Sequence, residues 1–277
     1  MKILASKFVL PITDDPIFDG AVAIESNKIV SVGKKQKIAE DFPEAEVRDF
    51  GEAAILPGFV NCHSHLELTA MRGFLDRFDD DFSSWLITLA KTRAERLTDH
   101  NIKSSALLGA LEGVKAGVTC FGDIGRFGEA GFEALVKNGL RGVLFQETDF
   151  APDNENAETE FEKLVEKHAK LNEKTTQLVE VGLSPHAPYT VSRKLFEKIT
   201  DYAIANKTKL TIHAAESSEE KSLMENGEGF FAEIYEKEKV NWNFPGSSTI
   251  EYLNDIGVLS AKPLLAHCVE ISSKDLE

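Results

Sequence analysis

The chain has 277 residues, of which 42% are hydrophobic and 28% are charged, so it is long enough for one large globular domain, or one large and one small. Lys and Arg number 31 against 46 Asp and Glu, and the net charge of −15 disfavours nucleic-acid and membrane partners, because such a surface repels phosphates and anionic headgroups. No secretory signal and no membrane-spanning apolar run is visible, and Cys62, Cys120 and Cys268 each lie inside an apolar run, as expected of free thiols. The sequence therefore predicts a cytoplasmic protein.

Residues 1–53 are expected to form short strands joined by turns. Ser26-Asn27-Lys28 separates two of the runs and has the composition of a hairpin turn. The segment is too small to bury a core by itself, so we interpret residues 1–53 as a small β-sandwich portion that packs on its neighbour. The predicted strands are Lys2–Leu10, Ala21–Glu25, Ile29–Val32, Val47–Phe50 and Ala53–Leu56.

From Pro57 onward, short apolar runs alternate with longer helical patterns. The predicted strands are Phe59–Cys62, Val118–Gly122, Leu140–Gln146, Leu178–Ser184, Leu210–His213 and Leu264–His267. The predicted helices are Ser84–Arg96, Asn101–Ala116, Glu129–Asn138, Glu155–Leu171, Ser192–Asn206, further helices between Glu219 and Asn254, and a helix that starts near Ser272.

This alternation predicts an α/β fold with a parallel sheet covered on both faces. We interpret residues 54–277 as about six βα units of a (β/α)8 TIM-type barrel that is incomplete here. An open doubly wound sheet is the alternative, although the chain has no Gly-rich phosphate loop of the usual types.

Five of the seven histidines lie at the carboxyl ends of predicted strands, and a parallel barrel brings these ends together at one mouth. We therefore expect residues that are distant in sequence to meet there. The five are His63, His65, His186, His213 and His267.

His63 and His65 form a His-x-His pair at the end of a strand. Alternate residues of a strand point the same way, so the two imidazoles are directed at one point, as a zinc-like ion requires. His213 ends a later strand and is the natural third nitrogen ligand. No lysine ends the fourth strand, which favours one metal over a lysine-bridged pair.

Other polar residues at the strand ends suggest catalysis and substrate binding. Glu216 follows His213 by three residues. A carboxylate at this position can transfer protons beside a metal, or it can stabilise the amino end of the next helix through the helix dipole. His267 can ligate the metal, hydrogen-bond the attacking water, or be a core histidine. His186 lies between Pro185 and Pro188 in a restricted loop that suits a substrate contact.

The combined motifs resemble the amidohydrolase superfamily. They are Pro57-Gly58-Phe59-Val60-Asn61 leading into His63-x-His65, then His213-x-x-Glu216, then His267; Arg72-Gly73, Trp85-Leu86 and Ser184-Pro185-His186-Ala187-Pro188-Tyr189 are similar to the deaminase and chlorohydrolase branch. The resemblance implies that one divalent metal, zinc or else iron, is bound by His63, His65 and His213. It also implies that Glu216 shuttles protons, His267 orients the attacking water, and His186 and Trp85 contact substrate.

Two further residues are substrate-contact candidates. The run His65-Leu66-Glu67-Leu68-Thr69 resembles a subgroup that deaminates aminofutalosine, a purine nucleoside. In such an enzyme Glu67 would hydrogen-bond a ribose or a ring nitrogen; otherwise it faces water. Arg126 would meet an anionic group of the substrate; otherwise it forms a surface ion pair.

The resemblance implies a metal-dependent hydrolase of non-peptide C–N bonds that deaminates a small nitrogen heterocycle or purine nucleoside, in a family where homodimers are frequent. A triazine-type chlorohydrolase and a non-catalytic metal-binding fragment are the alternatives. In the family a fourth ligand, an aspartate, ends the eighth strand, whereas Glu277 follows the sixth, so we expect this chain to be part of a longer protein.

Overall fold

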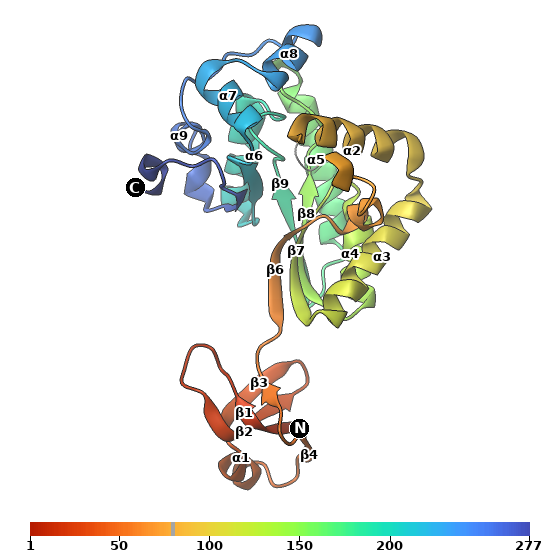
Figure 1. Cartoon of the computed structure of the whole chain (residues 1–277), viewed down its shortest axis with the longest axis vertical. Helices are drawn as coiled ribbons and strands as arrows, with labels where there is room; N and C mark the ends of the chain where they lie inside the picture. Colours follow the sequence, from red (N-terminus) through yellow and green to blue (C-terminus); the bar gives the residue numbers. More distant parts are fainter. Residues whose placement is uncertain (79–80) are drawn as a thin grey trace. The chain divides into compact units, whose positions relative to one another are not determined.

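The computed structural model describes residues 1–78 and 81–277. The chain divides into two compact units, Met1–Phe59 and Val60–Glu277 (Figure 1). No helix within the described residues is both long enough and apolar enough to cross a bilayer.

The first unit is a five-stranded sheet with one helix. Its strands are β1 (Lys2–Val9), β2 (Ile17–Glu25), β3 (Lys28–Lys34), β4 (Glu46–Asp49) and β5 (Ala54–Ile55). The order is β3-β2-β1-β4, and β5 pairs with β1. The predicted hairpin turn is confirmed, because β2 and β3 pair antiparallel and Ser26 between them has a left-handed φ of 54°.

Helix α1 (Lys35–Asp41) was not expected from the sequence. It has seven residues, and only Ile38 among them is buried, so it shows almost no apolar periodicity. Ile38 packs with Ile3, Ala5, Ala21 and Ala23 of the sheet, and this contact explains the helix better than local propensity does.

The second unit contains all six predicted strands, which form a four-stranded sheet and a two-stranded sheet. Its strands are β6 (Phe59–Ser64), β7 (Val118–Gly125), β8 (Arg141–Glu147), β9 (Val179–Ser184), β10 (Thr211–Ala214) and β11 (Leu264–His267). Strands β6-β7-β8-β9 form one sheet, β10 and β11 pair parallel, and a single bridge from Leu183 to Leu210 links β9 to the residue before β10. The β7–β8 and β8–β9 pairs are parallel, which confirms the α/β fold.

Helices follow the strands close to where the sequence predicts them. They are α2 (Phe82–Arg96), α3 (Asp99–Lys115), α4 (Gly128–Lys137), α5 (Ala157–Asn172), α6 (Arg193–Asn206), α7 (Ser218–Asn226), α8 (Phe230–Lys237) and α9 (Thr249–Asp255), with short 3-10 turns at Leu66–Met71, Asp76–Phe78, Asn154–Asn156, Val258–Ala261 and Ser273–Leu276. Side-chain caps explain several starts: Thr98 and Ser248 form capping boxes at α3 and α9, and Ser192 caps α6.

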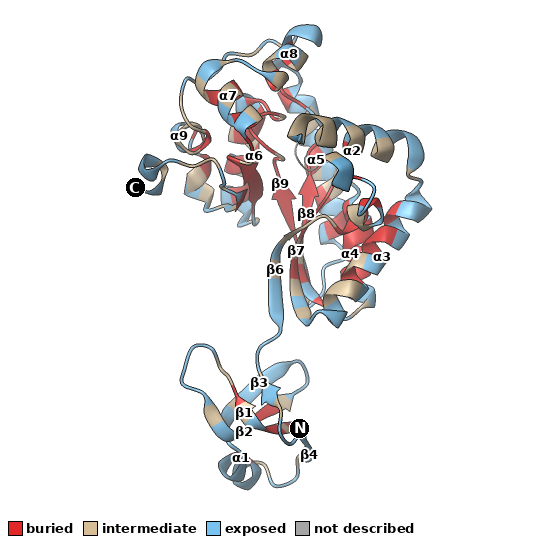
Figure 2. Ribbon diagram, in the orientation of Figure 1, coloured by how far each residue is buried: buried red, intermediate tan, exposed pale blue. Residues whose placement is uncertain are grey.

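The core of the second unit lies between the strands and these helices. Strands β7 to β9 are largely buried (Figure 2), and Leu144, Leu183 and Ile212 are completely so. Full burial of one such side chain stabilises a fold by roughly 1.5–3 kcal/mol. Strands β6 and β7 pack closely enough that a Cβ on Gly122 would overlap the carbonyl of Cys62, so glycine is required there.

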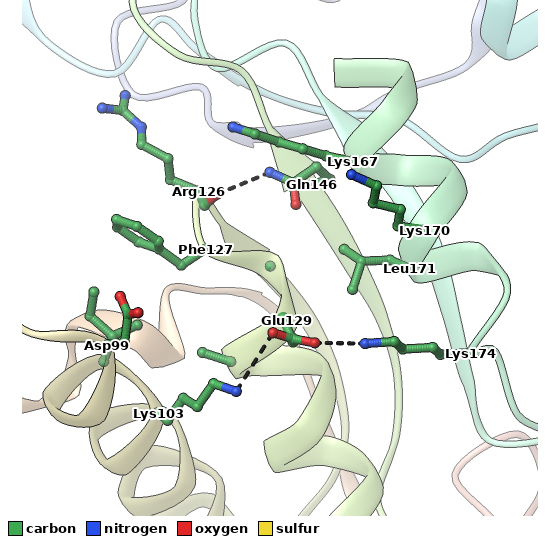
Figure 3. A pocket seen from close by; sticks show the side chains of 13 residues that line it. Asp99, Lys103, Arg126, Phe127, Glu129, Gln146, Lys167, Lys170, Leu171 and Lys174 are labelled. Atoms are coloured by element: carbon green, nitrogen blue, oxygen red, sulfur yellow. Dashed lines mark hydrogen bonds and ion pairs between the residues drawn. The ribbon is translucent and has the colours of Figure 1, made fainter. Parts of the chain in front are cut away.

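A cavity of about 410 Å³ lies beside α3, α4 and α5 (Figure 3). Lys103, Lys174 and Arg126 line it, but Glu129 accepts a hydrogen bond of 2.6 Å from Lys174 and forms an ion pair of 3.6 Å with Lys103. None of the histidines at the strand ends lines this cavity.

Candidate metal centre

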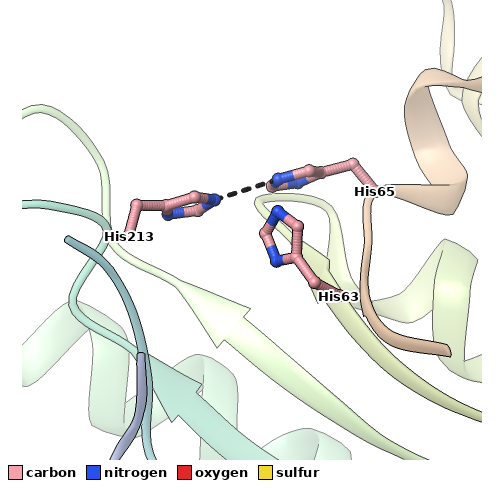
Figure 4. Close-up of side chains that lie close together, drawn as sticks. All are labelled: His63, His65 and His213. Atoms are coloured by element: carbon pink, nitrogen blue, oxygen red, sulfur yellow. Dashed lines mark hydrogen bonds between the residues drawn. The ribbon is translucent and has the colours of Figure 1, made fainter. Parts of the chain in front are cut away.

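Three histidines meet at the carboxyl ends of β6 and β10 (Figure 4). His63 lies in β6, His65 directly follows it, and His213 lies in β10. One ring nitrogen from each lies within 4.8 Å of the others. The structure thus brings together the residues for which the sequence predicted metal ligation, across 148 residues of chain between His65 and His213.

The hydrogen bonds of two of these rings fix their tautomers. His65 Nδ1 lies 3.1 Å from the carbonyl of Ile124, and His213 Nδ1 lies 2.9 Å from the carbonyl of His186. A carbonyl oxygen only accepts, so both Nδ1 atoms carry the hydrogen and both Nε2 atoms carry a lone pair.

The two Nε2 atoms lie 3.1 Å apart, and two lone pairs cannot hydrogen-bond to each other. A tetrahedral zinc with Zn–N bonds of about 2.0–2.1 Å separates two ligand nitrogens by roughly 3.3 Å. The arrangement therefore fits a shared cation, and these three imidazoles can hold a metal.

Burial keeps the same imidazoles neutral. It lowers the pKa of His63 to about 4 and, with the nearby His63 ring, lowers the pKa of His213 to about 3. Burial and the neighbouring His213 also place the pKa of His65 well below its ordinary value. Metal ligation requires the neutral ring, so all three are ready to bind at neutral pH.

Asp123 of β7 holds the His63–His65 segment in place and was missed by the sequence analysis. Its Oδ1 accepts hydrogen bonds from Ser64 Oγ at 2.9 Å and from the Leu66 amide at 2.8 Å, on either side of His65. Burial raises the pKa of Asp123 to about 8. The sequence feature that could have revealed Asp123 is a single carboxylate near the end of an otherwise apolar strand.

Glu216 and His267 lie together next to the three histidines. Glu216 Oε2 accepts a hydrogen bond of 2.8 Å from the Tyr189 hydroxyl, and its Oε1 lies 3.4 Å from His267 Nε2. The rings of His267 and His63 are 4.8 Å apart between centroids. Burial raises the pKa of Glu216, and the Tyr189 hydrogen bond opposes that shift.

A second missed residue, Glu220 of α7, fixes the turn that carries Glu216. Its carboxylate is fully buried and accepts hydrogen bonds from the amides of Ala215 at 3.0 Å and Glu216 at 2.8 Å. The Thr249 hydroxyl donates a third bond of 2.8 Å. Ala215 has a left-handed φ of 50°, a conformation that alanine adopts only when its surroundings enforce it.

His186 faces a further buried carboxylate, Glu147, at the end of β8. Its Nε2 lies 3.9 Å from Glu147 Oε1, and its Nδ1 lies 2.8 Å from the hydroxyl of Thr190. One ligand atom each from Glu147, His186 and His213 also lies within 4.8 Å of the others. The structure therefore places His186 beside the three-histidine group.

Glu67 and Arg126 meet just before α4. Glu67 is 2% exposed, so it does not face water; its carboxylate accepts hydrogen bonds from the amides of Phe127 at 2.9 Å and Arg126 at 3.3 Å, just before α4. The Arg126 side chain is 27% exposed, and its Nε lies 3.4 Å from Asp149 Oδ1 and 3.8 Å from Glu147 Oε2. Arg126 is thus partly buried among carboxylates.

Trp85 is not brought to the histidines by any contact within residues 1–78 and 81–277. It packs against the cluster of Met71, Leu75 and Leu89, and its ring stacks on Phe82 at 6.1 Å between centroids. Phe82 in turn lies 6.5 Å from the ring of Tyr189, the hydrogen-bond partner of Glu216.

Comparison with curated proteins finds relatives that are named as adenosine-type deaminases. The chain is 29% identical over 259 residues to a 5-methylthioadenosine/S-adenosylhomocysteine deaminase of Desulforamulus reducens, and 29% identical over 259 residues to a 5'-deoxyadenosine deaminase of Methanopyrus kandleri. Each match covers 93% of this chain, but the chain spans only 55% and 56% of the two relatives.

A solved structure supports the fold over the whole chain. Helicobacter pylori aminofutalosine deaminase in complex with methylthio-coformycin matches 100% of this chain and 66% of its own, with a TM-score of 0.84 and 22% identity. At that identity the likeness concerns the fold alone. The amidohydrolase family model matches residues 54–277, and the fold of this family is of the TIM-barrel type. The chain therefore belongs to the amidohydrolase family.

Proposed function

We propose that the protein is a metal-dependent aminohydrolase that deaminates an adenosine-type nucleoside. The observation that carries the proposal is the convergence of three neutral imidazoles with the partly buried carboxylate of Glu216 beside them. Two relatives named as deaminases of 5-methylthioadenosine/S-adenosylhomocysteine and of 5'-deoxyadenosine support this choice of substrate class.

We further propose one divalent ion, zinc or else iron, bound by His63, His65 and His213. Such an ion, when bound, acts as a Lewis acid that makes water a nucleophile near neutral pH. Neutral imidazole nitrogens suit both metals, and zinc is the first choice because three imidazoles with an open position are a common catalytic zinc set.

Glu216 moves the proton in this proposal. Its carboxylate accepts a proton from the attacking water and donates it to the departing amine nitrogen, a task that needs a pKa near the working pH. Burial shifts its pKa upward in the required direction. The Tyr189 hydroxyl holds Oε2 at 2.8 Å, which leaves Oε1 directed toward His267.

The remaining polar residues position water and substrate. His267 Nε2, 3.4 Å from Glu216 Oε1, is placed to hydrogen-bond the attacking water. His186 offers an unprotonated nitrogen to the heterocycle, whereas Trp85 and Arg126 act on the ribose or its 5' substituent. Glu67 holds the backbone amides of Arg126 and Phe127 in place. The cysteines Cys62, Cys120 and Cys268 are free thiols, which supports a reducing compartment such as the cytoplasm.

Ammonia release from adenosine, 5'-methylthioadenosine and 5'-deoxyadenosine by the zinc-loaded protein tests this function. Glu216→Gln should lower kcat by at least about 100-fold, because an amide cannot take the proton. Glu219→Gln, a matched change three residues further on, should leave the rate unchanged. Undiminished turnover by Glu216→Gln contradicts the assigned role, and chloride release from triazines without ammonia from any nucleoside contradicts the substrate class.

A further inference from the structure

One carboxylate oxygen of Glu147 is buried without a hydrogen-bond partner within the described residues. The residue is 3% exposed, and its Oε1 is buried with no hydrogen-bond donor within the described part of the chain. Its other oxygen lies 3.8 Å from Arg126 Nε, which balances charge without a hydrogen bond. A buried carboxylate oxygen without a donor is strongly unfavourable, so it indicates a missing partner.

His186 presents a second acceptor to the same place. The Thr190 hydroxyl donates to the carbonyl of Ala187 at 3.1 Å, so it accepts from His186 Nδ1 at 2.8 Å. Nδ1 therefore carries the hydrogen, and Nε2 carries a lone pair that faces Glu147 Oε1. Burial also sets the pKa of His186 well below its ordinary value, so the ring stays neutral.

Burial raises the pKa of Glu147 to about 7, so above that pH its ionised oxygen and His186 Nε2 are two acceptors. They face each other across 3.9 Å, which is too long for a direct hydrogen bond. One amino or hydroxyl group placed about 2.9 Å from both atoms would donate to both. The pair is not sealed off, because the His186 side chain is 17% exposed. His213 Nε2 is committed to the three-histidine group, so the pair lies beside the metal ligands without completing a second set of its own.

We propose that Glu147 and His186 form a two-acceptor subsite that binds an N–H or O–H donor of the nucleoside next to the metal centre. The new element is Glu147, a specificity residue that selects ligands with a donor at this position. The donor is either the ring amino group or a ribose hydroxyl. The inference rests on the proposed function.

Equilibrium binding to the zinc-loaded protein tests the subsite, with Glu216→Gln as the parent so that ligands are not consumed. Three probes separate the two donor sources: adenosine, purine riboside, which lacks the amino group, and 2',3'-dideoxyadenosine, which lacks the hydroxyls. In the parent, the analogue without the relevant donor should bind on the order of 10- to 100-fold more weakly than adenosine.

Glu147→Gln in this parent should weaken the binding of adenosine by the same factor, because the new amide would donate to His186 Nε2 and close the subsite. It should leave the affinity for the analogue that already lacks the donor almost unchanged. Asp149→Asn is the matched control, since it removes another carboxylate near Arg126 that is 44% exposed; its effect should stay below about fivefold. Zinc content and circular dichroism report whether each variant folds.

Equal binding of adenosine by the parent and by Glu147→Gln overturns the subsite and leaves the proposed function standing. Equal losses for all three probes also overturn it, because they indicate a general structural effect. If Glu147→Gln does not fold, the parent alone decides: equal affinity for the three probes leaves only a water at this position. A further outcome is that the Glu216→Gln parent binds none of the probes and the unchanged protein releases no ammonia from adenosine. That result contradicts the proposed function and the subsite together.

Discussion

At the scale of single residues, the candidate site is a set of polar groups that burial has pushed away from their ordinary charge states. The pKa of His63 falls to about 4 and that of His213 to about 3, mainly through burial. The same cause raises the pKa of Asp123 to about 8. Clustered shifts of both signs are typical of functional sites, although structural networks produce them too.

These histidine shifts predict how the metal-free protein responds to acid. Above pH 6.5, the ordinary value, His213 is neutral in the folded and unfolded states, so pH has no effect through it. Below 6.5 the unfolded chain binds a proton that the folded chain refuses until about pH 3, so the free energy of unfolding falls across that window. The buried carboxylates have raised pKa values, so they increase the free energy of unfolding as the pH falls. The contribution of His213 is therefore measured as the difference between the parent and a His213 variant.

We expect the free energy of unfolding of the metal-free parent, measured with urea at pH 7 and pH 4.5, to fall more than that of His213→Asn. His100→Asn is the control, because His100 is exposed on α3 and should leave the fall unchanged. The same fall in His213→Asn as in the parent would show that the buried neutral imidazole is wrongly assigned.

At the scale of secondary-structure elements, α4 packs on β7 through a glycine. A Cβ at Gly131 would overlap Asp123 Oδ2 and lie 2.9 Å from Leu144 Cδ1. Asp123 cannot swing aside, because Ser64 and Leu66 hold its other oxygen.

Gly131→Ala should therefore destabilise the protein by about 1–3 kcal/mol in urea denaturation. Helix propensity alone predicts the opposite sign, a gain of about 0.5–1 kcal/mol. Lys137→Ala in the same helix, where the side chain is 65% exposed, should change stability by less than about 0.5 kcal/mol. A stabilised Gly131→Ala protein would contradict this packing of α4.

The turn between β10 and α7 depends on one carboxylate in the same way. Glu220→Ala leaves the amides of Ala215 and Glu216 without their acceptor, and each unsatisfied buried donor costs about 1–3 kcal/mol. Thr249→Val removes a single bond and should cost about 1 kcal/mol. Ammonia release should fall with Glu220→Ala, while the zinc content of the protein is retained. Loss of zinc would instead show that Glu220 supports the metal site and does not act by orienting Glu216.

The elements themselves were largely predictable, because apolar periodicity and helix caps are local signals. The strand Leu264–His267 was predicted with the bounds that the structure has, and Ser272 caps the final turn as expected. Helix α1 was missed because its formation depends on contacts with β1 and β2 rather than on its own pattern.

At the scale of the whole molecule, parallel topology explains why the metal-binding candidates were visible in the sequence. The carboxyl ends of parallel strands converge, so histidines at the ends of β6, β10 and β11 had to approach one another. The roles of Asp123, Glu147 and Glu220 could not be predicted, because each depends on which backbone amides and side chains surround it in space. The same holds for Glu67, whose partners are the amides before α4.

The central claim is that His63, His65 and His213 bind one metal through their imidazoles, and X-ray absorption of the zinc-loaded protein tests it most directly. We predict about one zinc per chain with three imidazole ligands, and two imidazoles with at least about 100-fold weaker zinc binding in His65→Asn. His100→Asn should match the parent in both respects. A protein that retains no zinc, or a zinc spectrum that His65→Asn leaves unchanged, would contradict the account.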